Sequence, residues 1–498
     1  MAHSGIKYSR LDVPANSFQF KYFVLILLAV ATLIFILTLQ DRSSDRHRKD
    51  PDQSLNFVDF EKFLIGMNEK IDKRLSMFEK KEDATMKTQT IAYRRRPETK
   101  HIDCKRIFDG DKNYSQEMGK SRVALVPTAN LDMSCHAVRF RVLPPLPLDE
   151  IKFGVAFARI VYKDYEMLED EVRRLYHPQN SFCFAIDKKA PPEFHEKMLR
   201  LSSCLPNILL LPNEKAVDSA GHNVNEAHYN CMKVLINKPG WGYLMLLQNH
   251  DVVGKSVYEL VSIYDALGGA NDVEITPEAG RANKTLKWSA KDLQMFQNES
   301  GIPVDVLNRK MKMAKGAAQS SLSHAAVEWM VETTNLEKFI DQMNSGSFGV
   351  DEQFVESFQV SDFLGMPGHF TDECLKQGKN TDFVTRMSKW VYGNTEKCGT
   401  KKERHAICLL GVEDLPSIAK FPNLMFNKMM PDFDYGAVDC LGELIFNRTV
   451  LKKVDHILEM TYYENMVNVL YHKNRNNPEY KLNCTPSYQK WQQRNWLQ

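Results

Sequence analysis

Four short apolar runs decide the fold of this chain: FGVAFARIV at 153–161, SFCFAI at 181–186, NILLL at 207–211 and YLMLL at 243–247. Their length and their content of Val, Ile, Leu and Phe are typical of buried strands. The segments between them have helical periodicity, over 194–201, over 224–236, and on a face formed by Met167, Leu168, Val172 and Leu175. Alternating strands and helices predict a mostly parallel sheet with helices on both faces.

Ligands of such sheets bind beyond the carboxyl ends of the strands. Asp187 and Asp251 lie at two of these ends, and they are candidate ligand-binding residues. The alternative for each is a helix N-cap or a turn residue. A Gly-x-Gly-x-x-Gly motif does not follow the first strand, so a dinucleotide site of the usual type is not supported.

An uncharged run from Tyr22 to Leu39 is about 27 Å long as a helix, enough for a bilayer core. It is longer than a signal-peptide core, and no small-residue cleavage site follows it. All ten cysteines lie on its C-terminal side, as do five glycosylation sequons, at Asn113, Asn283, Asn298, Asn447 and Asn483. We expect a single-pass anchor with a cytosolic N-terminus and a lumenal, oxidised C-terminal domain.

Residues 40–103 are highly charged and poor in aliphatic side chains, as expected of a stem. Apolar residues recur there at helical spacing, at Phe57, Phe60, Leu64, Met67, Ile71, Leu75 and Phe78. The pattern is typical of a short coiled coil, which would give a homodimer, or of a helix that packs on its own catalytic domain.

Charge excludes one class of partner. The net charge is only +2, and no long basic run with interleaved aromatic residues occurs, which argues against nucleic-acid binding. The one dense basic cluster, Arg94–Arg96, is typical of a solvated linker or of a processing site rather than of a binding patch.

A series of motifs occurs in order between residues 104 and 445. They are PQNSFCFAID at 178–187, SCLPN at 203–207, AHYNCM at 227–232, Asp251, Lys287-Trp288, Asp351-Glu352, Arg386 with Lys389-Trp390, Cys398 with CLLG at 408–411, Asn427-Lys428 and DCL at 439–441. Together they resemble the core-2/I-branching family of β-1,6-N-acetylglucosaminyltransferases. The resemblance implies a type II Golgi membrane protein with a GT-A-like, Rossmann-type fold that works without a metal.

An inverting sugar transfer needs a base for the acceptor hydroxyl and a cation for the leaving nucleoside diphosphate. The resemblance implies Glu352 as the base and Lys428 as a phosphate contact, with Asp187 and Asp251 on the donor side. A second phosphate-binding arginine of the family is replaced by His405, next to Arg404. Either Arg404 substitutes for it, or His405 serves when protonated.

The acceptor would be bound, again by resemblance, by Glu274, Lys284, Lys287 and Trp288, and the tryptophan is also the anchor of the alignment. The alignment leaves a two-residue length difference between Glu274 and the tryptophan. The segment Ser219–Glu226 also departs from the family, whose residues there are aromatic or serine, so the specificity can differ from that of the core-2 enzymes.

No cofactor is expected beyond the UDP-sugar substrate. Three Asp-x-Asp spacings, at 50/52, 109/111 and 432/434, are weak evidence for a metal site because roughly two are expected by chance. The grouping of His222, His228 and Cys231 matches no standard zinc spacing.

The resemblance implies four disulfides, Cys104–Cys440, Cys135–Cys204, Cys183–Cys231 and Cys398–Cys408. Cys374 and Cys484 have no family counterpart. They pair with each other, stay as free thiols, or form an intermolecular bridge.

The sequence thus predicts a cytosolic tail (1–21), an anchor (22–39), a stem (40–103), a lumenal glycosyltransferase domain (104–445) and a C-terminal extension (446–498). The expected activity is inverting transfer of N-acetylglucosamine, or a related sugar, from UDP to an O-glycan hydroxyl as a β-1,6 branch. Two alternatives are a xylosyltransferase-like activity on protein serine and an inactive lumenal binding protein.

Overall fold

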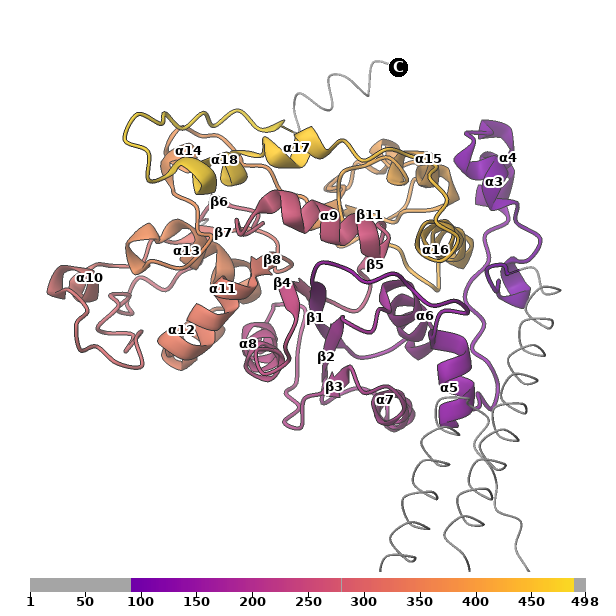
Figure 1. Ribbon diagram of the computed structural model, residues 1–498, viewed down its shortest axis with the longest axis horizontal. Helices are drawn as coiled ribbons and strands as arrows, with labels where there is room; N and C mark the ends of the chain where they lie inside the picture. Colours follow the sequence, from indigo (N-terminus) through magenta and orange to yellow (C-terminus); the bar gives the residue numbers. More distant parts are fainter. Residues whose placement is uncertain (1–90, 279, 488–498) are drawn as a thin grey trace, which may run out of the picture. The chain divides into compact units, whose positions relative to one another are not determined.

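The computed structural model describes residues 91–278 and 280–487 (Figure 1). The chain divides into Met1–Ala92 and Tyr93–Gln498, and nearly all described residues belong to the second unit. The expected anchor at 22–39 and the stem pattern at 57–78, with its homodimer contact, lie outside the described residues. Within the described ranges no helix has the length and hydropathy needed to cross a bilayer.

The predicted sheet is confirmed. Its strands are β1 (Gly154–Val161), β2 (Ser181–Ile186), β3 (Ile208–Leu210), β4 (Trp241–Leu247) and β8 (Ser321–Ser323), in the order β3-β2-β1-β4-β8. The first four run parallel, and β8 pairs antiparallel with β4 at one edge. The sheet is therefore mostly parallel, with its carboxyl ends at one side.

Alternation along β1 creates two cores, one on each face of the sheet. Val155 and Phe157 pack in one cluster with α6 (Tyr165–Leu175), α7 (Pro192–Cys204) and α9 (Val257–Leu267). Ala156 and Ala158 pack in the other with α8 (Val224–Leu235) and α13 (Phe354–Val360). Helices therefore cover both faces, as the sequence predicts.

A second, smaller sheet lies beyond the carboxyl end of β4. It has the order β5-β12-β9, from Val252–Val253, Met425–Asn427 and Arg386–Ser388. Strand β12 is antiparallel to β5 and parallel to β9. Two antiparallel pairs complete the strands: the hairpin of β10 (Glu403–Arg404) with β11 (Ile407–Cys408), and β6 (Thr276–Pro277) with β7 (Ala314–Lys315), which are far apart in the sequence.

The remaining elements are helices around these sheets, most of them short. They are η1 (Pro97–Thr99), α3 (Cys104–Phe108), α4 (Lys112–Lys120), α5 (Cys135–Val142), α10 (Val304–Asn308), α11 (His324–Glu328), η2 (Trp329–Thr333), α12 (Glu337–Asn344), η3 (Val350–Gln353), η4 (Asp362–Leu364), α14 (Glu373–Lys376), η5 (Thr395–Lys397), η6 (Val412–Asp414), α15 (Leu415–Ile418), α16 (Tyr435–Thr449), α17 (Met460–Glu464) and α18 (Val467–Asn474).

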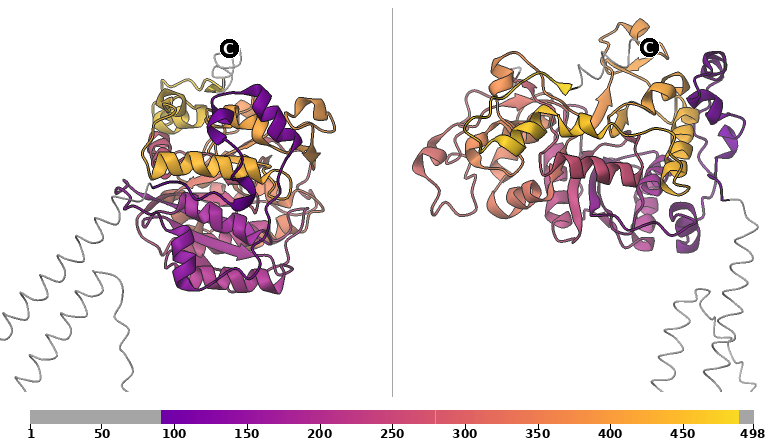
Figure 2. Two further views of the ribbon diagram at one scale, coloured as in Figure 1. Left: turned by 90° about the vertical axis from the view of Figure 1, so that its right-hand side faces the viewer. Right: turned by 45° about the horizontal axis from the view of Figure 1, so that its top comes forward.

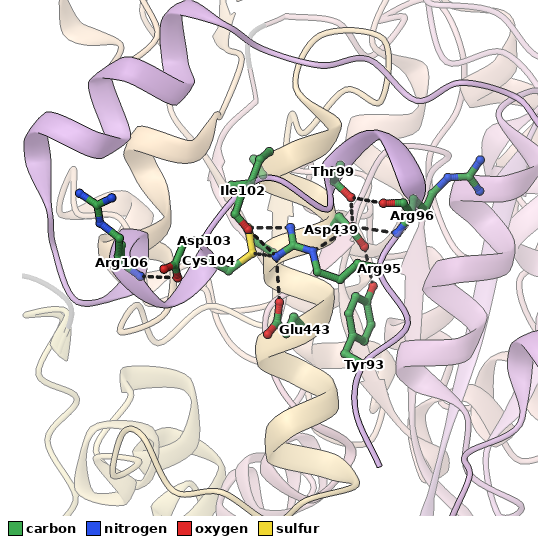
Figure 3. The surroundings of a disulfide bond; sticks show 12 residues. Tyr93, Arg95, Arg96, Thr99, Ile102, Asp103, Cys104, Arg106, Asp439 and Glu443 are labelled. Atoms are coloured by element: carbon green, nitrogen blue, oxygen red, sulfur yellow. Dashed lines mark hydrogen bonds and ion pairs between the residues drawn. A yellow bond between two sulfur atoms is a disulfide. The ribbon is translucent and has the colours of Figure 1, made fainter. Parts of the chain in front are cut away.

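Residues 93–103 belong to the folded domain rather than to a stem. Figure 2 shows this N-terminal segment, in indigo, against α16. Asp439 of α16 accepts a hydrogen bond from the Tyr93 hydroxyl at 2.9 Å, and Arg95 pairs with Glu443 at 3.0 Å (Figure 3). The expectation of a solvated linker around Arg95 is therefore wrong, because its guanidinium binds the helix.

Five disulfides pair all ten cysteines. Four are the pairs that the resemblance implies, Cys104–Cys440, Cys135–Cys204, Cys183–Cys231 and Cys398–Cys408. The fifth joins Cys374 of α14 to Cys484 near the C-terminus, which decides among the three alternatives for these two residues. The C-terminal extension is thereby attached to the domain.

Candidate active site

Positive charge gathers beside the small sheet. Lys428 follows β12, Arg386 begins the neighbouring β9, and the Lys428 ammonium donates to the Arg404 carbonyl at 3.5 Å. Burial, reinforced by the charges of Arg404 and Arg386, lowers the pKa of Lys428 to about 8. A cluster of three cations suits an anionic ligand such as a diphosphate.

Arg404 rather than His405 carries charge at this site. Burial lowers the pKa of His405, and the charges of Lys428 and Arg404 lower it further. The imidazole is therefore neutral near pH 7. Of the two candidates for the second phosphate contact, the structure favours Arg404.

Asp251 lies behind the cations. It is fully buried, and its carboxylate accepts hydrogen bonds from the Gln248 backbone at 2.7 Å, from Gln319 at 3.1 Å and from Asn427 at 3.0 Å. These contacts fix the end of β12, which carries Lys428. Asp251 thus positions the strand end that leads to Lys428, and its own oxygens accept hydrogen bonds from protein groups.

Asp187 lies at the end of β2, as predicted. Its Oδ1 accepts from the backbone N–H of Lys189 at 3.0 Å and of Val217 at 3.3 Å. The carboxylate joins the loop after β2 to the loop before α8. The structure thus adds a turn-holding role to the expected donor-side position.

Glu352 lies in η3, directly before α13. Its Oε2 accepts a hydrogen bond from Nη1 of Arg281, which also donates to the Gly349 carbonyl at 3.3 Å. Gly349 has φ +61°, and a Cβ there would lie 2.0 Å from the Arg281 nitrogen. The glycine therefore permits the approach of Arg281, and the side chain of Glu352 stays 29% exposed.

Two further carboxyl groups lie close to Glu352. Burial and the Glu352 charge raise the pKa of Asp351 to about 6. Glu356 is fully buried, and its Oε2 has no hydrogen-bond partner among the described residues. Burial, with the charges of Asp351, Glu352 and Glu274, raises the pKa of Glu356 far above its usual range. Burial thus favours the protonated form of Asp351 and Glu356, whereas Glu352 is the more exposed carboxyl group of the three.

A cleft of about 360 Å³ lies beside strands β6 and β9. Glu274, Arg386 and Trp390 line it. Trp390 is 44% exposed and stacks on Tyr392 with 5.5 Å between ring centroids. An exposed aromatic stack beside polar groups suits a ligand that has both an apolar face and hydroxyl groups.

The structure brings together only part of the expected acceptor set. Burial raises the pKa of Glu274 in the cleft. Lys284 and Lys287, by contrast, are exposed in the loop before Trp288. Trp288 itself is buried, donates to the Asn283 carbonyl at 2.9 Å and packs on Phe339. A direct acceptor contact through Trp288 is therefore wrong, because its ring belongs to the core.

Sequence reasoning missed Arg281, Arg386 and Glu356 as site residues. Arg281 was overlooked because the alignment on Trp288 selected the lysines of the same loop. The signal that could have identified Arg386 is its place in a motif that carries the family resemblance, Arg386 with Lys389-Trp390. Nothing in the sequence marks Glu356, because its burial depends on tertiary packing.

The divergent segment Ser219–Glu226 contacts the loop that carries Glu352. The Val350 N–H donates to the Ala220 carbonyl at 3.1 Å, and the Asn225 side chain donates to the Val350 carbonyl at 2.9 Å. A difference from the family in this segment is thus transmitted directly to the position of Glu352.

The metal-like spacings have structural explanations. Asp111 caps α4 and Asp434 caps α16, so two of the Asp-x-Asp pairs belong to helix starts, while 50/52 lies outside the described residues. His222 bonds to Asp218, and buried His228 lies against the Leu247 carbonyl. Cys231 is in a disulfide, so these three residues form no zinc site.

Four sequon asparagines are exposed. Asn113 lies on α4, and Asn283, Asn298 and Asn483 lie in loops. Asn447 is inside α16, where Thr449 of its sequon is buried. A glycan needs an exposed acceptor, so the structure favours the first four.

Comparison with known proteins identifies relatives over most of the domain. A β-1,3-galactosyl-O-glycosyl-glycoprotein β-1,6-N-acetylglucosaminyltransferase of bovine herpesvirus 4 is 25% identical over 379 residues, covering 71% of this chain and 84% of the relative. The Danio rerio enzyme of that name, number 4, is 27% identical over 362 residues, which cover 69% of this chain and 83% of the relative. The human enzyme, number 3, is 24% identical, covering 70% and 84%.

One solved structure, the mannosyltransferase Ktr4p of S. cerevisiae, matches at 12% identity over 52% of this chain and 77% of that chain; its TM-score of 0.20 is too low to bear on the fold. The model of the Core-2/I-Branching enzyme family matches residues 155–419, more than half of the sequence. This match includes Glu274, Glu352 and Arg404. The chain therefore belongs to the core-2/I-branching enzyme family of glycosyltransferases.

Proposed function

We propose that this chain transfers N-acetylglucosamine from UDP to a hydroxyl of an O-glycan, with inversion, to form a β-1,6 branch. The observation that carries the proposal is the position of Arg386. Arg386 lines the cleft together with Glu274, and its strand β9 pairs with β12, the strand that leads to Lys428. One arginine thus links a carboxyl group of the expected acceptor side to the cations of the expected donor side.

Glu352 serves as the base in this proposal. Its carboxylate takes the proton from the acceptor hydroxyl as that oxygen forms a bond to the anomeric carbon and the bond to the diphosphate breaks. Lys428 and Arg404 neutralise the charge that develops on the leaving UDP. The family relatives named above support the sugar and the linkage, and the cation cluster supports charge neutralisation by side chains without a metal.

The same proposal places the enzyme in the Golgi membrane as a single-pass type II protein with a GT-A-like lumenal domain. Five disulfides support an oxidising compartment. The mostly parallel sheet with helices on both faces supports the fold class.

Transfer assays test the proposal. The purified full-length chain is incubated with a panel of UDP-sugars and a β-1,3-galactosyl-GalNAc glycoside in the presence of EDTA, and the linkage of the product is assigned by NMR. We expect transfer from UDP-N-acetylglucosamine to a 6-hydroxyl. A strict requirement for added Mn²⁺, or transfer to protein serine, would contradict it.

A further inference from the structure

One wall of the cleft comes from the far C-terminus. Pro486 lines the cleft together with Glu274, Arg386 and Trp390. Residues Asn380 and Thr381, which follow α14, line it as well. The cleft is thus built partly from a segment that begins more than 60 residues beyond the family match, which ends at residue 419.

Pro486 is held firmly in this wall. Two residues before it, Cys484 is buried and bonded to Cys374 of α14. One residue after it, the Ser487 hydroxyl donates to the Asn465 carbonyl at 2.6 Å. Pro486 itself is buried, and its ring has few conformations available.

The disulfide also connects two parts of the same wall. Cys374 begins the turn that leads to Asn380, and the Lys379 N–H donates to the Cys374 carbonyl at 2.9 Å. Further along, the Asp382 carboxylate accepts from the Val467 N–H at 2.9 Å. Figure 1 shows α17 and α18 running along the edge of the domain near α14. The extension and residues 377–383 therefore form one tethered unit.

We propose that the tethered segment Cys484–Ser487 determines acceptor specificity, by placing the Pro486 ring against the group attached to the acceptor sugar. This inference rests on the proposed function, in which the cleft holds the acceptor. A proline offers a rigid apolar surface without an N–H donor, so it selects by size and apolarity rather than by hydrogen bonding. The ligand class is the aglycone or neighbouring residue of an O-glycan.

The test uses the full-length chain and two acceptors, the methyl and the benzyl glycoside of β-1,3-galactosyl-GalNAc. In Pro486→Trp we expect the KM for the benzyl glycoside to rise about tenfold, the size of effect that one or a few extra carbons have in a pocket. The KM for UDP-N-acetylglucosamine should stay within about twofold of wild type.

A matched pair of disulfide variants separates specificity from stability. Cys374→Ser with Cys484→Ser should reduce the preference between the two glycosides. Cys135→Ser with Cys204→Ser, which opens a disulfide between α5 and α7, should lower the Tm but leave the preference unchanged.

The two proposals fail in different ways. If the wild-type enzyme transfers to both glycosides and every variant keeps the wild-type preference between them, the specificity role alone is overturned. A wild-type chain that transfers to neither glycoside overturns the proposed function and this inference with it.

Discussion

Arg281 donates a hydrogen bond through Nη1 to Oε2 of Glu352, and the two side chains form an ion pair. The pair joins the loop that follows β6 to the turn that begins α13. The proposed base is thereby oriented by a cation that the sequence alone did not select.

Arg281→Ala should lower kcat/KM for the acceptor by about 10- to 100-fold, because a charge-assisted hydrogen bond that orients a carboxylate is worth ~1.5–3 kcal/mol. Lys284→Ala and Lys287→Ala are the matched controls, since both lysines are exposed in the same loop. Steady-state kinetics of the three variants decide the matter. Normal activity in Arg281→Ala, with loss of activity in a lysine variant, would contradict the role of Arg281. It would instead support Lys284 or Lys287 as the acceptor-binding residue.

Glu356→Gln should stabilise the protein at neutral pH. Because burial raises the pKa of Glu356, the folded state retains a proton that the unfolded chain releases above about pH 4.3, so stability falls as the pH rises. An amide removes this proton linkage. We expect a gain of ~1–3 kcal/mol in the free energy of unfolding at pH 7.5, and a smaller gain at pH 5.

Urea denaturation at both pH values measures the gain, with the exposed Glu328→Gln as control. An equal effect of Glu356→Gln at pH 5 and pH 7.5 would show that Glu356 does not hold a proton in the fold.

UDP binding should weaken above pH 8. The pKa of Lys428 is about 8, so its positive charge is mostly lost by pH 9, and the affinity for UDP should fall by up to about tenfold between pH 7 and pH 9. Lys428→Arg should remove most of this dependence, because arginine stays charged. Calorimetric titration of UDP measures it, with the exposed Lys420→Ala as control. A pH-independent affinity in the wild type would exclude Lys428 from the phosphate site.

Peptide mapping without reduction should recover Cys374 linked to Cys484, with no alkylated form of either peptide. The reason is that both sulfurs are buried in a formed disulfide that ties the C-terminal segment to α14. An alkylated Cys374 peptide from the native protein would contradict the tether and the cleft wall that depends on it.

The sheet was predictable because its strands are continuous apolar runs. Along β1, for example, Val155 and Ala156 face different cores, and only a strand buried on both faces gives such a sequence. The four family disulfides were predictable by resemblance. The partner of Cys374 was not, since spacing alone cannot fix connectivity.

Candidate site residues could be named from the sequence only where a motif fixes a residue on a rigid element. Glu352 and Lys428 follow such motifs, at η3 and after β12. Arg281 lies in a loop whose length differs from the family, and length differences in loops shift side chains without leaving a pattern. Glu356 is one residue of an ordinary helix, and only the packing of α13 shows that its carboxyl is buried.

The most direct test of the account is the rate of transfer by Glu352→Gln. With the exposed Glu328→Gln as the control for a carboxylate-to-amide change, we predict that kcat falls by about 10²–10⁴-fold in Glu352→Gln alone. The thermal shift on adding UDP should be unchanged in both variants, because the donor cations are intact. Transfer at the wild-type rate by Glu352→Gln, with the same UDP shift, would contradict the assignment of Glu352 as the base.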